Sequence, residues 1–579
     1  MIDEITPGKQ VGNQADLTNP ARRELLFASA ALAGGAELAG APPLAAPPSV
    51  RRDALTSPPT TPFVVALPVY GAKAPVTALV PAPGRTPTGQ EAGRAAHQRA
   101  TEFAPQKLYE LRVRPLSHSF HPELPTQIMW GYDGMLPGPT FAARYGEPVL
   151  VRIFNDLPSN HVGIGSPEIS THLHNAHSAS ESDGYPGDYY SATKAGPTLL
   201  YPGRYKDHLY PNCYAGFDQY RPSGDAREAL GTLWYHDHRH DFTAQNVYRG
   251  LAGFYLLFDA LDSGNENDSN LNALRLPSGI GRYDIGLAID DRQFDSGGYL
   301  AFDQFDTDGL LGDKMMVNGK VQPFFSVQRR KYRFRLLNAG LARFYQLFLT
   351  RAGVPQSFTY IANDGNLLPA PLTMSSFRLG SAERADLVID FSLFPLGTKL
   401  VLENRLEQVN GRGPTGNLLT PGMPLMRFDV DAEPPVPDAS RVPAVLRQQP
   451  PINMAEVVRT RTFRFNRTNS VWTVNGLLFD LFSTSIQVKR GSAEIWVLQG
   501  STGWHHPVHI HLEEGRILSR NGKPPPPHER GRKDVFVLEP GEEVKVFMRF
   551  RDFVGKYVMH CHNLTHEDHA MMLRFDVVP

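Results

Sequence analysis

Hydrophobic and polar residues alternate over short runs along much of the chain, and a period of two predicts β-strands that are buried on one face. Three such runs are residues 149–155, 332–338 and 493–498. Each follows a turn in which glycine comes after Asp or Asn, at Asp133-Gly134, Asn318-Gly319 and Asn475-Gly476. The layout that these stretches share predicts a threefold internal repeat.

The repeat predicts an all-β fold. Few stretches show the 3.6-residue apolar periodicity of a helix, and 51 glycines and 50 prolines favour short strands joined by turns. A chain of 579 residues is too long for one ordinary core, so we expect three Greek-key β-sandwich domains. Their predicted bounds are 101–262, 263–440 and 441–579.

The residues before position 101 do not follow this strand pattern. Residues 47–100 are rich in Pro, Ala and Thr and are expected to form a linker without a fold of its own. Within residues 1–46, Arg22 and Arg23 precede a stretch of small, mildly apolar residues, as in a twin-arginine export signal. Glu37 interrupts that stretch, and the alternative is a disordered tail.

The export signal, the hydropathy and the net charge limit where the protein is located and what it can bind. An export signal would send the protein to the periplasm or outside the cell, and a cytoplasmic or spore-associated location is the alternative. No apolar run approaches the roughly 20 residues that cross a bilayer, so no membrane span is expected. A net charge of -1 and a pI near 7.1 give no general attraction to nucleic acid. We expect a monomer whose partners are small molecules.

Four His-x-His pairs are the main chemical signal. They are His172/His174, His236/His238, His509/His511 and His560/His562. Residues two apart in a strand point to the same face, so each pair presents two imidazoles to one locus. One pair alone is a weak signal, because histidine pairs are common on surfaces. Four pairs predict a cluster of metal ions between the first and third domains, and eight imidazoles can be divided as two, three and three among three coppers.

Cys561 lies between His560 and His562, so its side chain points away from theirs in a strand and needs a separate metal. Its companions are His506, His566 and Met571, which give the site two imidazoles, one thiolate and one thioether. This set describes a blue-copper electron-transfer site, whereas zinc makes little use of a thioether. The backbone around Cys561 would join this copper to the cluster.

Together these residues resemble the multicopper oxidases, from about residue 108 to residue 579. The matching motifs are residues 171–174, 234–238, 506–511 and 560–562, with Met571. Within the family, residues 174–184, 246–250 and 381–386 are similar to bacterial spore-coat laccases, bilirubin oxidases and phenoxazinone synthase. The resemblance implies cupredoxin-like domains and four coppers per chain, one of type 1, one of type 2 and two of type 3.

The resemblance also implies which residue binds which copper. His172 and His509 would hold the type 2 copper. The type 3 pair would be held by His174, His236, His238, His511, His560 and His562. The type 1 ligands would be His506, Cys561, His566 and Met571. No ligand position departs from the family's pattern, and Met571 at the axial place implies a moderate reduction potential.

Two carboxylates, Asp183 and Glu567, match acidic positions that the family uses to deliver protons. The alternatives are that Asp183 caps a turn before Gly184 and that Glu567 is a solvated surface charge. His177, His240, His505 and His569 are off the ligand register and are expected at the surface or beside ligands. Cys213 is expected to be a free thiol.

Two loops stay open to interpretation. The Tyr-rich segment 185–225 is expected to cover the first domain, and the alternatives are a substrate lid or a redox-active chain of tyrosines. Residues 524–527 are four prolines that form a stiff turn, which we place on the substrate side because it follows the 506–511 motif.

The function implied is a laccase-like oxidase. It would couple one-electron oxidation of phenols, aminophenols, aromatic amines or bilirubin-like pigments to the four-electron reduction of dioxygen to water. One alternative is a metal-ion oxidase of Mn(II) or Cu(I), although the 13 methionines form no Met-rich block of the kind that cuprous oxidases carry. Another is a copper-binding electron carrier without turnover.

Overall fold

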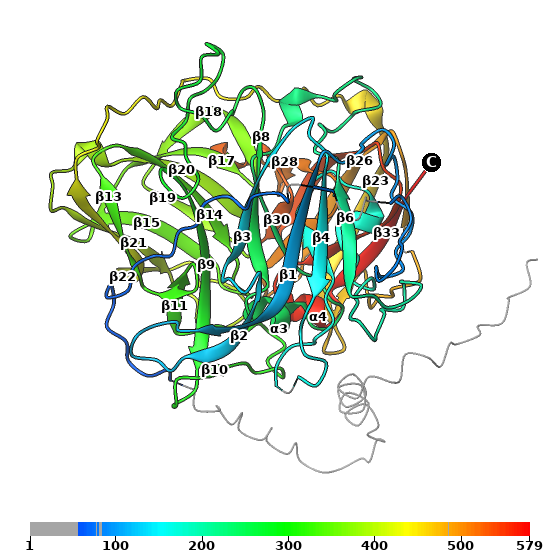
Figure 1. The fold of residues 1–579 in the computed structure, drawn as a ribbon, viewed down its shortest axis with the longest axis horizontal. Helices are drawn as coiled ribbons and strands as arrows, with labels where there is room; N and C mark the ends of the chain where they lie inside the picture. Colours follow the sequence, from blue (N-terminus) through cyan, green and yellow to red (C-terminus); the bar gives the residue numbers. More distant parts are fainter. Residues whose placement is uncertain (1–55, 77, 80–83, 162, 485) are drawn as a thin grey trace, which may run out of the picture. The chain divides into compact units, whose positions relative to one another are not determined.

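The computed structural model describes residues 56–579, except 77, 80–83, 162 and 485. The predicted export signal and the first part of the predicted linker lie outside these residues. The described chain is built mainly of strands, arranged in six sheets that form three sheet pairs along the sequence (Figure 1). The all-β prediction is confirmed. The domain bounds near 262 and 440 stay predictions.

Sheet pair 1 spans residues 107–258. One sheet has the order β2 (Gln127–Tyr132), β1 (Lys107–His118), β4 (Val149–Asn155), β6 (Tyr205–Tyr210). The other has the order β3 (Gly138–Arg144), β8 (Ala252–Phe258), β7 (Thr232–Asp237), β5 (Thr171–Leu173). A core that includes Trp130, Phe141 and Leu233 is built from both sheets.

Sheet pair 2 spans residues 284–432. One sheet has the order β12 (Lys320–Val321), β11 (Lys314–Val317), β9 (Asp284–Phe294), β14 (Lys331–Asn338), β20 (Arg384–Asp390), β17 (Phe358–Asn363), β18 (Asn366–Met374), with β10 (Leu300–Ala301) on β9. The other has the order β13 (Phe324–Gln328), β22 (Leu418–Ala432), β21 (Lys399–Leu406), β15 (Tyr345–Arg351), β16 (Val354–Gln356), with β19 (Ser376–Leu379) on β15.

Sheet pair 3 spans residues 457–578. One sheet has the order β24 (Val471–Val474), β23 (Val457–Thr468), β26 (Ser492–Gly500), β31 (Glu543–Phe550), β28 (Gly515–Arg520), β29 (Arg532–Lys533). The other has the order β25 (Ile486–Lys489), β33 (Met572–Val578), β32 (Gly555–Cys561), β27 (His506–Ile510), β30 (Val535–Leu538). In Figure 1, β23 and β33 lie to the right and β13 and β21 of sheet pair 2 lie to the left.

The helices of the described chain are short. The α-helices are α2 (Ser180–Asp183), α3 (Thr243–Tyr248) and α4 (Leu564–Asp568). The 3-10 helices are η2 (Ala226–Glu228), η3 (Phe391–Leu393), η4 (Met454–Glu456) and η5 (Pro527–Glu529). Among the residues described, none of these is long and apolar enough to span a membrane.

The strand register confirms the internal repeat. The three alternating runs lie in β4, β14 and β26, and each pairs in parallel with the strand that opens its sheet pair, β1, β9 or β23. The second sheet of each pair also contains one equivalent parallel strand pair: β3 with β8, β13 with β22 and β25 with β33.

The expectation that these runs are buried on one face only is wrong. Nearly every residue of β4 and β14 is buried, including polar Arg152 and Arg335. Carboxylates compensate these charges: both oxygens of Asp207 accept from Arg152 at 2.8 Å, and Asp284 accepts from Arg335 at 2.7 and 2.8 Å. A buried charge is tolerated when it is paired in this way, so alternation alone could not reveal that the polar side is also covered.

The described part of the predicted linker, within 56–100, packs against the sheets. It forms isolated bridges, such as Ala66 with Phe324 and Glu91 with Tyr205, and no strand of a larger sheet. His97 is buried, and the backbone N–H of Gln98 donates to Glu181 at 2.7 Å.

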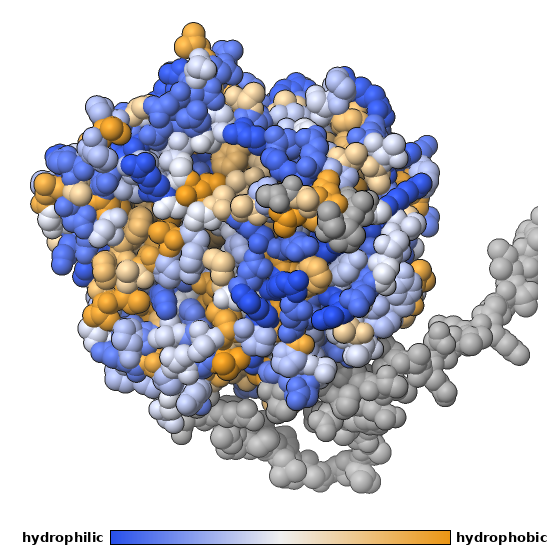
Figure 2. Space-filling view, viewed as in Figure 1, coloured by the Kyte–Doolittle hydropathy of each residue, from blue (hydrophilic) through white to orange (hydrophobic). Residues whose placement is uncertain are grey.

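Figure 2 shows one face of the molecule, where hydrophilic residues predominate and hydrophobic residues form smaller groups between them.

Candidate metal centre

The eight histidines of the four pairs come together where sheet pair 1 meets sheet pair 3. Strand pairing aligns them: His172 of β5 lies opposite His236 of β7, and His509 of β27 lies opposite His560 of β32. The second member of each pair is two residues further along the chain. All eight side chains are buried. The predicted convergence of distant parts of the chain is therefore present in the fold.

Their Nε2 atoms fall into three groups. His172 and His509 form the first, with their Nε2 atoms 3.3 Å apart. In the second, Nε2 of His174 lies 3.2 Å from that of His236 and 3.2 Å from that of His562. In the third, Nε2 of His560 lies 3.2 Å from that of His238 and 3.3 Å from that of His511. The groups contain two, three and three imidazoles.

This spacing suits metal ions. Nitrogen ligands at roughly 2.0 Å from one ion, at tetrahedral angles, lie about 3.3 Å from each other. Burial, together with the neighbouring imidazoles, lowers the pKa of His172, His174, His238, His509, His511 and His562, and lowers that of His236 to about 3. Neutral rings keep the lone pair that a metal needs. The donor set therefore fits copper.

The outer nitrogens of two histidines are held by Asp183. His172 Nδ1 bonds to the backbone carbonyl of Asp183 at 2.5 Å, and His511 Nδ1 donates to its Oδ2 at 2.6 Å. Asp183 ends α2, and Gly184 follows it in a left-handed conformation with φ 89°. A Cβ at position 184 would lie 2.2 Å from the carbonyl oxygen of Thr171, so only glycine brings α2 this close to β5.

Glu567 holds the third group in a similar way. Its two carboxylate oxygens lie 3.3 Å from Nδ1 of His238 and 2.9 Å from Nδ1 of His560. The residue is buried in α4, whose first turn is capped when the Asn563 side chain accepts from Thr565 N–H. The idea that Glu567 is a solvated surface charge is wrong.

Asp534 is a further partner that the sequence analysis missed. Its backbone carbonyl accepts from His509 Nδ1 at 2.9 Å, and its carboxylate lies 3.5 Å from Nδ1 of His174. Arg384 of sheet pair 2 binds both carboxylate oxygens at 2.5 and 2.8 Å. Asp534 precedes β30, and no spacing to a histidine motif marks it in the sequence.

The side chain of Cys561 belongs to a second centre. Its Sγ lies 3.5 Å from Nδ1 of His506 and 3.5 Å from Nδ1 of His566. A metal with bonds of roughly 2.0 Å to nitrogen and 2.3 Å to sulfur places these atoms about 3.5 Å apart. Burial raises the pKa of the Cys561 thiol and lowers that of His506 to about 3. As predicted, Cys561 turns away from the site of His560 and His562.

The surroundings of this second centre are apolar on one side and hydrogen-bonded on the other. Met571 is fully buried in the same core as Cys561, and its carbonyl accepts from the Cys561 N–H at 3.1 Å. The Trp472 ring lies over His566 with centroids 3.7 Å apart. Nε2 of His566 bonds to the Asp308 carbonyl at 3.0 Å, which fixes the ring.

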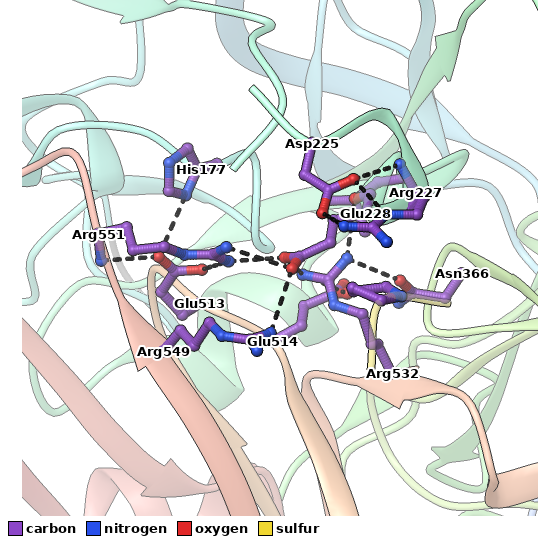
Figure 3. A network of polar contacts seen from close by, with 12 residues as sticks. His177, Asp225, Arg227, Glu228, Asn366, Glu513, Glu514, Arg532, Arg549 and Arg551 are labelled. Atoms are coloured by element: carbon purple, nitrogen blue, oxygen red, sulfur yellow. Dashed lines mark hydrogen bonds and ion pairs between the residues drawn. The ribbon is translucent and has the colours of Figure 1, made fainter. Parts of the chain in front are cut away.

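Other predicted features lie outside both centres. His177 is buried and bonds to Asp552 at 2.7 Å, beside the buried ion pairs of Glu513 and Glu228 with Arg551 (Figure 3). Cys213 is a buried free thiol. The Tyr-rich segment contains β6, which pairs with β4, and two of its tyrosines, Tyr190 and Tyr210, are buried in the core of sheet pair 1.

The sequence is similar to a known family pattern and to individual known proteins. The sequence pattern described as "Multicopper oxidase" matches residues 451–579 and, in a second form, residues 117–209. The chain is 35% identical over 478 residues to a bilirubin oxidase of Albifimbria verrucaria, covering 81% of this chain and 76% of the relative. It is 32% identical over 517 residues to a laccase of Bacillus subtilis, covering 81% and 94%.

Solved structures share the fold. McoA multicopper oxidase of Aquifex aeolicus superposes with a TM-score of 0.67 at 24% identity, over 82% of this chain and 97% of that one. A laccase of Pediococcus acidilactici superposes with a TM-score of 0.67 at 22% identity, over 91% and 95%.

Proposed function

The chain belongs to the multicopper oxidase family, and from this premise we propose how its own residues divide the work of the reaction. It is a laccase-like oxidoreductase that contains copper and uses dioxygen as electron acceptor. Copper, when bound, supplies the one-electron redox chemistry and the reduction of dioxygen to water. The observation that carries the proposal is the grouping of eight buried imidazoles, by their Nε2 distances, as two, three and three, next to a cysteine with two further histidines.

We assign four coppers per chain to these groups. His172 and His509 would hold the type 2 copper, and the two groups of three would hold the type 3 pair. His506, Cys561 and His566 would hold the type 1 copper, the blue centre, together with Met571 from the same buried core. Cys561 is bonded through the backbone to His560 and His562, so the residues that would hold the blue centre and the trinuclear cluster are joined covalently by a few bonds.

Asp183 and Glu567 have two roles in this proposal. They orient His511, His238 and His560 through the outer ring nitrogens, as carboxylates commonly do for metal-binding histidines. They also deliver protons, because reducing one dioxygen to two waters consumes four protons as well as four electrons. Burial raises the pKa of Asp183, which favours a carboxyl group that can carry a proton.

The reductants are small aromatic molecules: phenols, aminophenols, aromatic amines or bilirubin-like pigments. The relatives named laccase and bilirubin oxidase support this class. Dioxygen uptake by copper-loaded protein with 2,6-dimethoxyphenol tests turnover, and metal analysis tests the copper count. A colourless protein, or one that binds far fewer than four coppers, would contradict the proposal. Uptake with Mn(II) or Cu(I) alone would point to metal-ion oxidation instead.

We further propose that the protein is a monomer exported through its Arg22-Arg23 segment. Replacing both arginines by lysine should keep the protein in the cytoplasm. Cell fractionation followed by size-exclusion chromatography checks the location and the monomer together.

A further inference from the structure

Lys206 of β6 is a fully buried amine in sheet pair 1. Its Nζ forms no hydrogen bond or ion pair with any residue that the structure describes. Lys533 is buried too, but it binds Glu383 at 2.9 Å and Asp364 at 3.0 Å. A buried charge without a partner lowers stability, and an apolar side chain would fill the same space at no such cost. Packing alone therefore does not account for Lys206.

The side chain of Lys206 faces α2, the helix that ends at Asp183. His208 comes two residues after Lys206 in β6, so both side chains point to the same face of the strand. On that face, His208 Nδ1 donates to the backbone carbonyl of Ser182 at 2.9 Å. Ser182 precedes Asp183 in α2. The amine is therefore directed toward the end of α2 at which the cluster histidines are held.

Two carboxylates act on Lys206 from a distance. Asp183 and Asp188 flank residues 184–187, the segment that follows α2. Burial lowers the pKa of the Lys206 amine, and Asp188 opposes this effect. Burial raises the pKa of the Asp183 carboxyl, and Lys206 opposes that effect. The ammonium interacts with both groups and is bonded to neither, so its flexible four-carbon side chain can move between them.

Asp188 connects this region to solvent. Its Oδ1 accepts from Lys556 Nζ at 2.7 Å, and the Lys556 side chain is 21% exposed whereas that of Asp188 is 5% exposed. At the inner end, Asp183 Oδ2 accepts from His511 Nδ1 at 2.6 Å. The groups form a series that begins at the surface with Lys556 and Asp188. Lys206 is the titratable group between Asp188 and Asp183.

We propose that Lys206 carries protons from Asp188 to Asp183, so that the Asp183 carboxyl regains a proton after each one that it delivers. The inference rests on the oxidase function and the proton role of Asp183 proposed above, and it adds the group that supplies the proton and its route from solvent. Lys206 acts through Asp183, so it is a positioning residue for the proton.

Each transfer moves one proton and no electron. An N–H bond of the Lys206 ammonium breaks and an O–H bond of Asp183 forms, which leaves a neutral amine and a protonated carboxyl. The amine then takes a proton from the Asp188 carboxyl, and Asp188 regains its own from solvent at the Lys556 end. Between transfers His208 can hold the ammonium. Its Nε2 has no partner among the described residues, and burial together with the charge of Lys206 lowers its pKa, so the ring is a neutral acceptor.

The test measures dioxygen uptake by the copper-loaded full-length protein with saturating 2,6-dimethoxyphenol, in H2O and in D2O. Lys206→Met keeps the length of the side chain and removes the proton. We expect kcat to fall about 10²-fold, as for a lost acid or base, and its solvent deuterium isotope effect to increase. KM for the phenol, the copper content and the blue absorption should match the wild type.

Lys206→Arg separates charge from proton transfer. A guanidinium keeps the positive charge but does not release its proton, so this variant should lose as much activity as Lys206→Met. The matched control is Lys107→Met, which changes a partly exposed lysine of β1 that pairs with Glu147. It should turn over like the wild type in both solvents.

Two more variants test the route. In an Asp183→Asn background, Lys206→Met should lower kcat no further, because residues that act in one series are not additive. Asp188→Asn keeps the shape of the side chain and cannot carry a proton, so it should lower kcat and raise the isotope effect in the same direction as Lys206→Met. It decides the question if Lys206→Met does not fold.

A Lys206→Arg variant that turns over at the wild-type rate would show that only the charge matters and would overturn the inference. Unchanged kcat and isotope effect in Lys206→Met or Asp188→Asn, or losses that multiply in the double variant, would overturn it as well. In these cases the wild type still oxidises the phenol, so the proposed function stands. A wild type that consumes no dioxygen would refute the proposed function and this inference with it.

Discussion

At the scale of single residues, Asp183 serves two histidines with two different oxygens. Its carbonyl fixes His172 and its carboxylate fixes His511, so one residue orients ligands from both ends of the chain. The sequence pointed to Asp183 only through its match to the family. The contact depends on Gly184, which allows α2 to lie close to β5. The spacing of residues in the sequence does not predict that short distance.

Asp183→Asn keeps the shape of the side chain and removes its ability to carry a proton. We expect kcat for dioxygen reduction to fall by about 10²-fold, in the range that a positioned acid or base contributes. The blue absorption should persist, because Cys561 is unaffected. Asp218→Asn, an exposed carboxylate, is the control. Turnover at the wild-type rate would show that the proton does not pass through Asp183.

His177 predicts a dependence of stability on pH. Glu513 and Asp552 raise its pKa against the opposing effect of burial. A raised folded-state pKa means that the stabilisation is complete below the ordinary histidine pKa of about 6.5 and is lost as pH rises through the raised value. His177→Gln should therefore lower the free energy of unfolding by about 1–3 kcal/mol at acidic pH and by less at alkaline pH. Denaturant titrations across that range check this, and a loss that grows with pH would contradict it.

At the scale of elements, β32 separates two metal sites by the alternation of its side chains. His560 faces the cluster and Cys561 faces the blue centre, an arrangement that follows from strand geometry alone. The pairings of β5 with β7 and of β27 with β32 do not follow from sequence, because register is set by contacts between strands that are far apart in the chain.

Cys561→Ser tests this separation. We expect the blue absorption and oxidation of aromatic donors to disappear while the three cluster coppers stay bound, because the eight cluster imidazoles are untouched. Metal analysis and electron paramagnetic resonance of the type 2 copper measure this. Loss of all the copper would mean that the two sites do not fill independently.

The ion pair between Arg384 of β20 and Asp534, the residue before β30, joins sheet pairs 2 and 3. Arg384 and Asp534 are both fully buried, so Arg384→Met leaves an unpaired charge and should cost about 3–5 kcal/mol of unfolding free energy. Arg378→Met breaks the exposed pair with Glu539 and should cost at most about 1 kcal/mol. Urea titration compares the two variants, and equal losses would count against the proposed importance of the buried pair.

At the scale of the whole molecule, repetition was predictable and burial was not. The three alternating runs led to three equivalent sheet pairs with matching parallel pairings. The alternation in these runs wrongly predicted that their polar face is exposed to solvent. Arg152 and Arg335 on that face are buried and form ion pairs with carboxylates. A cavity beside His505 could not be predicted from the sequence either, because residues far apart in the chain, from sheet pairs 2 and 3, line it.

Metal that binds between sheet pairs 1 and 3 should stabilise the folded chain, because it binds the native state in preference to the unfolded one. Removing copper with a chelator should lower Tm by several degrees, and adding copper back should restore it. Differential scanning calorimetry measures both steps. An unchanged Tm in fully depleted protein would argue against a metal site shared by the two sheet pairs.

His172 and His509 share one proposed copper although 337 residues separate them. During synthesis the cluster histidines at positions 172–238 leave the ribosome long before those at positions 509–562 have been translated. Cofactor insertion must therefore be one of the last events in the biogenesis of this enzyme, and a cell that supplies copper early gains nothing until translation is nearly finished.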